Sequence, residues 1–237
     1  MSIQKIPEKN AILFAWFNQY SGVLLKTPSK TFAIDPVDVK LKFLRNVDVV
    51  LLTHEHYDHL DSRLVSEVQR VTGCLVVADP ASAFVLKPHL PVDRLRVLRV
   101  GEQIMVGGVS VKAAKCSHNA RYPNTYIITS EDGVKVYHTA DSLPFPELAK
   151  LGLEEKFDVV FCSVGITIGA SPESGFEIAR LTKPHLVVPY HTNLVGSQRV
   201  FQELVRKGLP YTGCLIPEVN KIYQVSKKQQ SVNGGGM

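Results

Sequence analysis

Short apolar runs recur along the chain, and turn-forming residues separate them. Their length and their content of Val, Ile and Phe favour β-strands over helices. The segment Ser-Glu-Asp-Gly at 130–133 predicts a hairpin turn between two of these strands. We expect the strands at residues 11–17, 22–26, 31–34, 47–52, 75–78, 109–114, 125–129, 134–137, 158–163 and 185–189.

Helical patterns lie between some of these runs. In residues 61–71, apolar side chains repeat on one helical face after Asp61, which is an N-cap candidate. A second helix is expected from Ser171-Pro172, because proline is favoured at the first helical position. A third covers residues 198–207. This order of strands and helices predicts one αβ domain whose helices cover packed sheets.

Length and composition narrow the class of protein. The 237 residues are 45% hydrophobic and 21% charged, which fits a globular chain and excludes a disordered or fibrous one. The chain contains no stretch of about 18 uncharged apolar residues that would predict a membrane-spanning helix. We expect a single domain over residues 1–225 and a flexible C-terminal tail over residues 226–237.

Charge and cysteine content add weaker constraints. The net charge of +5 permits an anionic substrate or nucleic acid without arguing for either. The four cysteines lie far apart and form no C-x-x-C pair, which argues against a cysteine-based zinc or redox motif. We therefore expect a reducing, cytoplasmic compartment. The apolar run at 11–17 is interpreted as a strand and not as an export signal.

One segment, Thr53-His54-Glu55-His56-Tyr57-Asp58-His59, carries most of the candidate chemistry and directly follows an apolar strand. If the chain stays extended there, His54 and His56 project to the same side and can bind one metal ion. A turn at Tyr57-Asp58 would redirect Asp58 and His59 toward a second ion. Imidazole and carboxylate ligands suit zinc, iron, manganese or nickel.

Further ligands are expected where other strands end. His118, Asp141 and His191 each follow an apolar run, at the positions where loops gather at a sheet edge. Asp141 would bridge the two ions. The first ion would be held by His54, His56 and His118, and the second by Asp58, His59 and His191. His138, three residues before Asp141, is a candidate supporting residue.

With these residues in this order, the sequence resembles the metallo-β-lactamase superfamily from residue 11 to about residue 223. Within it, the chain is similar to the short metal-dependent hydrolases that include the ascorbate-6-phosphate lactonase and the N-acylethanolamine phospholipase D. The resemblance implies an α+β fold, a four-layer αββα sandwich with a dinuclear site at one edge. Supporting features are Ile34-Asp35-Pro36, Tyr137-His138, and Lys183-Pro184 before Val188-Pro189-Tyr190-His191. Relatives often carry Gly directly before the bridging Asp, where this chain has Ala140.

The resemblance also implies an activity. A metal-bridging hydroxide would cleave a small ester, lactone or phosphodiester, with Asp58 orienting the hydroxide and Asp141 passing a proton to the leaving group. Diiron redox members of the superfamily carry Glu where this chain has His56, so the imidazole favours the hydrolase type. We expect two divalent metal ions, zinc first, with manganese, nickel or iron as alternatives.

The substrate is expected to be a small molecule that can be anionic. Asn119, Arg121 and Tyr122, just after His118, are candidate substrate contacts, and a guanidinium suits a carboxylate or phosphate. Gly169 lies in the loop 165–172, whose backbone amides could bind an anion before the following helix.

Three other functions stay open. The chain could be a nuclease of the same fold, although its length leaves no room for an added nucleic-acid-binding module. It could also be an iron-dependent redox enzyme, or a non-catalytic metal-binding protein. The complete ligand set argues against the last of these.

Overall fold

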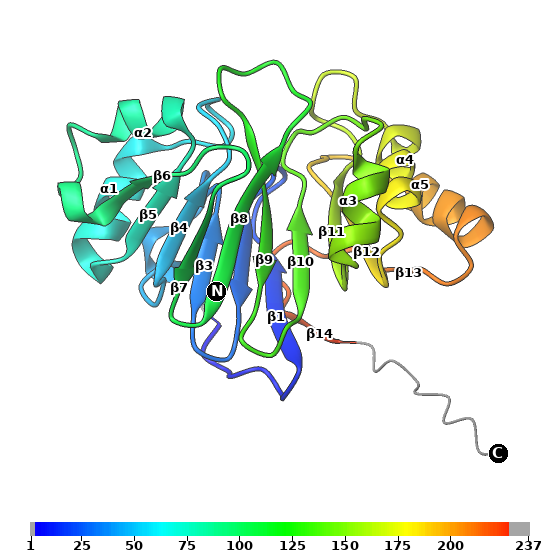
Figure 1. The fold of residues 1–237 in the computed structure, drawn as a ribbon, viewed down its shortest axis with the longest axis horizontal. Helices are drawn as coiled ribbons and strands as arrows, with labels where there is room; N and C mark the ends of the chain where they lie inside the picture. The colour runs from blue at the N-terminus through cyan, green and yellow to red at the C-terminus, as the bar shows by residue number, and fades with distance from the viewer. Residues whose placement is uncertain (1–2, 228–237) are drawn as a thin grey trace.

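The structure is a computed structural model and describes residues 3–227. Within that range the strands form two seven-stranded sheets that face each other, with helices on both outer faces (Figure 1). This arrangement confirms the expected α+β class and the four-layer αββα sandwich. The first sheet has the order β14-β1-β2-β3-β4-β5-β6, and the second has the order β13-β12-β11-β10-β9-β8-β7.

The bounds of the strands follow the apolar runs closely. The strands of the first sheet are β1 (Ala11–Trp16), β2 (Val23–Lys26), β3 (Thr31–Ile34), β4 (Val49–Leu52), β5 (Leu75–Ala78), β6 (Leu95–Val97) and β14 (Tyr223–Ser226). Those of the second are β7 (Gln103–Val106), β8 (Val109–Lys115), β9 (Asn124–Thr129), β10 (Lys135–His138), β11 (Val159–Ser163), β12 (Leu186–Tyr190) and β13 (Gly213–Cys214). The expected hairpin turn joins β9 to β10, where Ser130 N donates to Val134 O.

Each sheet joins an antiparallel half to a parallel half. In the first, the strands from β14 to β3 pair antiparallel and those from β3 to β6 pair parallel. In the second, the strands from β7 to β10 are antiparallel and those from β10 to β13 are parallel. The carboxyl ends of the parallel strands therefore meet at one edge of each sheet.

The strands at the centre of each sheet are buried on both faces. In β4, Val49 and Leu51 face the core between the sheets, whereas Val50 and Leu52 pack under the helices of the first sheet. Because neither face meets water, the sequence shows an unbroken apolar run in place of alternation.

Helices cover the outer faces of both sheets. The helices α1 (Ser62–Thr72) and α2 (Pro80–Leu86) cover the first, and α3 (Leu148–Glu155), α4 (Pro172–Thr182) and α5 (Val195–Gly208) cover the second (Figure 1). Short 3-10 turns lie at Leu41–Phe43 and Val92–Arg94. The expected helices correspond to α1, α4 and α5, whereas the strand and helix ranges expected from the sequence did not include α2, α3, β6, β7, β13 or β14.

Two expectations concern the ends and the exterior of the chain. Strand β14 ends at Ser226, so the first residue of the expected tail belongs to the first sheet, and residues 228–237 lie outside the described part. No helix within residues 3–227 is long and apolar enough to cross a membrane.

Candidate metal centre

The predicted ligands come from loops that leave the carboxyl ends of strands at one edge of the sandwich. His118 follows β8, Asp141 follows β10 and His191 follows β12. These three strands run in the same direction, because β9 is antiparallel to both β8 and β10, and β10 to β12 are parallel. The turn expected at Tyr57-Asp58 is present after β4, where His59 N donates to His56 O.

The first ligand group consists of His54, His56 and His118. The Nε2 atoms of His54 and His118 each lie 3.1 Å from Nδ1 of His56. Nitrogens on a tetrahedral zinc, at about 2.0–2.1 Å from the ion, lie about 3.3 Å apart. The three imidazoles are therefore arranged as one ion would require. Burial and the neighbouring His59 lower the pKa of His54 to about 2, so it is neutral, the form that binds metal.

The second ligand group consists of Asp58, His59, Asp141 and His191, all buried. Asp141 Oδ1 lies 2.9 Å from His59 Nε2 and 3.1 Å from His191 Nδ1. Asp58 Oδ2 lies 3.6 Å from His191 Nε2 and 3.8 Å from His59 Nε2. Burial alone would raise the pKa of Asp141, but His59 and His191 hold it well below its usual range.

Three atoms of this second group test whether it fits a cation. His59 Nε2, His191 Nε2 and Asp141 Oδ1 are buried, and none of them makes a well-aligned hydrogen bond to a described residue, although His59 Nε2 and Asp141 Oδ1 lie 2.9 Å apart. A buried polar atom left in that state costs about 1–3 kcal/mol. A divalent cation satisfies such lone pairs, and imidazole with carboxylate is a donor set that zinc, manganese, iron and nickel accept.

Asp141 connects the two ligand groups. Its Oδ1 faces His59 and His191, whereas its Oδ2 lies 3.6 Å from His118 Nε2. One carboxylate thus reaches the nitrogens of both groups. The residue before it, Ala140, has a φ of 49°, a left-handed conformation that glycine adopts without strain. This conformation gives a physical reason for the Gly that relatives often carry there.

Asp35 orients His59 from behind the ligands. It is fully buried, and its Oδ2 accepts hydrogen bonds from Ser21 Oγ and Thr53 Oγ1, both at 2.7 Å. The same Oδ2 lies 2.7 Å from His59 Nδ1. Burial opposes the charged form of His59, but Asp35 and Asp141 on either side raise its pKa. With Nδ1 donating to Asp35, Nε2 of His59 is directed toward the ligand group.

His191 has its own supports. Its Nδ1 lies 2.9 Å from Thr167 Oγ1 and 3.2 Å from Ser163 Oγ. Its φ of 54° is left-handed, as is that of Asp35 at 45°. Strained backbone of this kind persists where the surrounding structure fixes a functional side chain.

His138 lies behind the ligand groups and belongs to neither of them. Its Nε2 donates to Ser21 O at 2.9 Å, and Ser21 in turn bonds to Asp35. Burial lowers the pKa of His138, so the imidazole is neutral. It therefore supports the residues that orient His59.

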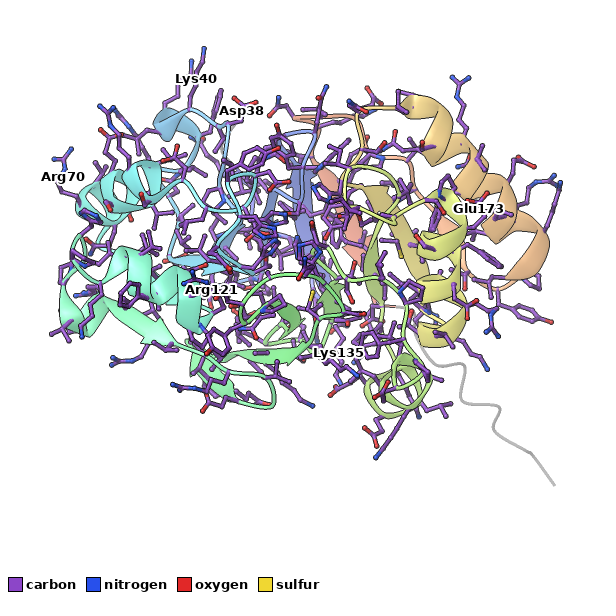
Figure 2. The ribbon with its side chains drawn as sticks, turned by 90° about the horizontal axis from the view of Figure 1, so that it is seen from above. Asp38, Lys40, Arg70, Arg121, Lys135 and Glu173 are labelled. Atoms are coloured by element: carbon purple, nitrogen blue, oxygen red, sulfur yellow. The ribbon has the colours of Figure 1, made fainter. Side chains whose placement is uncertain are left out.

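A cavity of about 720 Å³ opens onto the ligands. Of the candidate substrate contacts, Asn119 lines this cavity, whereas Arg121, Tyr122 and Gly169 do not. Arg121 is exposed, and the view from above shows it near α2, away from α4 and α5 (Figure 2). The lining residues are His56, Tyr57, Asp58, Ser117, His118, Asn119, Asp141, Leu143, Ile166, Thr167 and Ile168.

Several residues beside the predicted ligands could not be assigned a role from the sequence alone. Asp35, Ser21 and Thr53 form the buried network around His59, and Ile166 and Ile168 form part of the cavity wall. Asp35 directly follows the buried strand β3. In the same way, His54, Asp141 and His191 closely follow β4, β10 and β12. That position, together with Ile34-Asp35-Pro36 as a family feature, was the signal that could have identified it.

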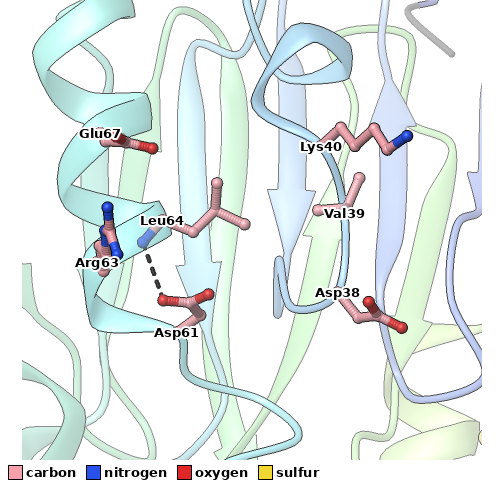
Figure 3. Close-up of a pocket in the computed structure, with 7 residues that line it drawn as sticks. All are labelled: Asp38, Val39, Lys40, Asp61, Arg63, Leu64 and Glu67. Atoms are coloured by element: carbon pink, nitrogen blue, oxygen red, sulfur yellow. Dashed lines mark hydrogen bonds between the residues drawn. The ribbon is translucent and has the colours of Figure 1, made fainter.

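Another hollow, of about 380 Å³, lies between α1 and the segment after β3 (Figure 3). Its charged side chains have mixed signs, with Lys40 and Arg63 beside Asp38, Asp61 and Glu67. Asp61 caps α1 by accepting from Leu64 N at 2.9 Å. None of the predicted ligands lines this hollow, so the metal centre remains the candidate site.

Known proteins resemble this chain in sequence and in fold. A UPF0173 protein of Pyrococcus abyssi is 27% identical over 183 residues, covering 76% of this chain and 83% of its own. A UPF0173 metal-dependent hydrolase of Thermoplasma acidophilum is 26% identical over 187 residues, covering 75% and 81%. The structure of a metallo hydrolase from Ignicoccus hospitalis superposes with a TM-score of 0.78 at 20% identity, covering 92% of this chain and all of that one.

The family model described as a beta-lactamase superfamily domain matches residues 15–191. That range begins within β1 and ends at His191, so it contains every predicted ligand. The chain therefore belongs to this family of the beta-lactamase superfamily.

Proposed function

We propose that the chain, a metal-dependent hydrolase of this superfamily, binds two divalent cations, with zinc as the preferred metal. We propose that it cleaves a small ester, lactone or phosphodiester. The observation that carries the proposal is the pair of adjacent ligand groups with Asp141 between them, beside a cavity that residues of both groups line. Cations bound there would supply Lewis acidity to the scissile group and to the attacking water.

The chain's own residues have distinct tasks in this proposal. Asp58 and Asp141 both line the cavity and both belong to the second ligand group. Asp58 would orient the attacking water by accepting its hydrogen bond, and Asp141 would pass a proton to the leaving group. Asp35 and Thr167 would keep the Nε2 atoms of His59 and His191 directed at the ligand group.

Metal content is the first test. Full-length protein is purified without added metal or a histidine-affinity column, and metal per chain is measured by plasma mass spectrometry. We expect about two ions of zinc, manganese or nickel per chain, as dinuclear hydrolases require. Chelation should abolish hydrolysis in a screen of esters, lactones and phosphodiesters, and added zinc should restore it. A chain that neither carries nor takes up metal would contradict the proposal.

The variant Asp141→Ala tests the bridging role. It should lose at least one ion per chain and nearly all activity, because both ligand groups lose the carboxylate between them. Asp93→Ala, at an exposed carboxylate on a 3-10 turn, is the matched control and should keep both ions. Full metal content and turnover in Asp141→Ala would remove Asp141 from the proposal.

A further inference from the structure

Part of the cavity lining beside the predicted ligands is apolar. Leu143, Ile166, Ile168 and Tyr57 line it, from loops that follow β10, β11 and β4. Ile168 is 93% exposed and Tyr57 is 80% exposed, although both are large side chains. Large apolar side chains left in water beside a functional cavity mark the surface that a ligand covers.

The same cavity offers little to an anion apart from the metal ligands. Among the described residues that line it there is no Lys or Arg, and the carboxylates of Asp58 and Asp141 are its only acidic groups. A phosphate or carboxylate held away from the ligands would lose its water without gaining a cationic partner, which is strongly unfavourable.

The loop 165–172, expected to bind an anion through its amides, uses several of them internally. Ile166 N donates to His191 O, and Ala170 N donates to Thr167 O, both at 2.9 Å. Ser171 and Ser174 form a capping box that closes the start of α4, where Ser171 N donates to Ser174 Oγ and Ser174 N to Ser171 Oγ. These amides are not available to a ligand.

Two cationic side chains, Arg99 and Lys115, face a different hollow. Arg99 and Lys115 line a neighbouring cavity of about 550 Å³ together with Tyr122. Lys115 is already paired with Glu147 at 2.9 Å. An anionic group bound beside these cations would lie in a cavity that contains none of the predicted metal ligands.

From these observations we infer that the substrate is a neutral ester or lactone whose acyl part is apolar and packs against Ile168, Ile166 and Tyr57. This inference rests on the proposed function and narrows it, because it predicts that uncharged substrates are preferred over phosphodiesters and phosphorylated substrates. Water attacks the acyl carbon, the bond to the alkoxy oxygen breaks, and that oxygen takes up a proton. An ester gives a carboxylic acid and an alcohol, and a lactone gives a single hydroxy acid.

A series of hydroxamic acids tests the apolar wall by binding. The hydroxamate group anchors each ligand on the zinc-loaded, full-length protein, while the alkyl chain grows from two to eight carbons. Affinity measured by calorimetry should rise by about two- to fourfold per methylene until the wall is covered. A terminal carboxylate on the longest chain should weaken binding by about tenfold or more.

Two variants of Ile168 test whether this side chain causes the dependence of affinity on chain length. Ile168→Ser should flatten the dependence on chain length, and Ile168→Lys should favour the ligand with the terminal carboxylate. The side chain is almost fully exposed, so neither change removes a core contact. Ile6→Ser is the matched control, because Ile6 is also exposed, at 66%, and does not line the cavity. The control should leave the series unchanged.

The outcomes separate this inference from the proposed function. A flat series, or a preference of the unmodified protein for the terminal carboxylate, would overturn the inference. Hydrolysis of bis(p-nitrophenyl) phosphate in preference to p-nitrophenyl octanoate would also overturn it while leaving the hydrolase proposal intact. Protein that binds no hydroxamate and hydrolyses neither compound would contradict the proposed function itself, and the inference with it.

Discussion

At the scale of single residues, the ligands depend on groups that never touch the cavity. Asp35 is the clearest case, since Ser21, Thr53 and His59 all bond to the same carboxylate. A carboxylate behind a ligating imidazole fixes the tautomer and raises the basicity of the ligand. The strained backbone at Asp35, Ala140 and His191 indicates that the fold holds these residues against local preference.

Asp35→Asn tests this orienting role. The amide nitrogen that replaces Oδ2 cannot accept from His59 Nδ1, so the imidazole loses its fixed tautomer while Thr53 N can still donate to the remaining oxygen. We expect zinc affinity to fall by about 10- to 100-fold, measured by competition with a chromophoric chelator. Asp48→Asn is the control, because Asp48 accepts from Thr31 N at the far end of β3 and β4, and its affinity should not change. Equal affinities in both variants would contradict the role.

At the scale of elements, close packing between α3 and α4 explains why a glycine, a poor helix former, lies within α3. Gly152 lies within α3, where a Cβ would come 2.7 Å from Cα and O of Thr182 at the end of α4. Helix α3 can approach α4 this closely because Gly152 has no side chain. The same glycine lowers helix propensity, which is one reason why the sequence pattern did not predict α3.

Gly152→Ala should therefore destabilise the protein, although alanine favours helices. We expect a loss of about 1–3 kcal/mol in the free energy of unfolding, measured with urea, because the methyl group forces α3 and α4 apart. Gly196→Ala is the matched control, since a Cβ in this first turn of α5 meets nothing within 4 Å. It should be neutral or stabilise by up to about 1 kcal/mol. Similar losses at both positions would exclude a packing cause.

The start of α2 carries a buried charge that makes stability depend on pH. Asp79 caps the helix by accepting from Ala81 N and Ser82 N. Burial raises the pKa of Asp79 to about 6, against about 3.9 in an unfolded chain. Folding thus favours protonated Asp79, and the stability it contributes is present below about pH 4 and is lost as the pH rises through about 6.

Asp79→Asn keeps an N-cap without a buried charge. Relative to this variant, the unmodified protein should lose about 2 kcal/mol of unfolding free energy between about pH 4 and pH 7, measured with urea on metal-free protein. Ser171→Asn, at the cap of α4, is the control: it removes no ionisable group, so its effect should not vary with pH. If the difference in unfolding free energy between the two proteins does not vary with pH, ionisation of Asp79 does not destabilise the fold.

At the scale of the whole molecule, the sequence predicts what is buried on both sides better than what lies at the edges. Central strands such as β4 appear as unbroken apolar runs, because sheets and helices exclude water from both faces. The edge strands β6 and β7 are short and partly exposed, and thus leave no such run. Helix α2 has Asp79 and Pro80 as start signals but too few polar positions to show a helical face.

The candidate site follows the same division. The clustering of these His and Asp side chains could be predicted because they stand next to apolar strands whose carboxyl ends meet at one edge. Asp35 stands in the same kind of position, but a single carboxylate carries no ligand spacing, so only its place after a strand and the family feature Ile34-Asp35-Pro36 could have identified it. The apolar wall formed by Ile166 and Ile168 could not be predicted, because exposure of these side chains follows from the path of a loop and not from its composition.

We expect the candidate metal centre to depend on contact between the two sheets, and Phe161 tests that dependence. Its ring meets Phe14 of the first sheet edge-on at 5.1 Å, and its carbonyl accepts from Thr139, two residues before Asp141. Phe161→Ala should lower the free energy of unfolding by about 3–5 kcal/mol, measured with urea, because a large cavity opens in the core. Phe84→Ala, at a ring 78% exposed on α2, should change it by less than about 0.5 kcal/mol.

If Phe161→Ala stays folded, zinc should also bind more weakly, because the β10 and β11 ends that carry Asp141 and Thr167 lose their shared support. Unchanged zinc affinity in a destabilised variant would show that the loops hold the ligands without help from the core.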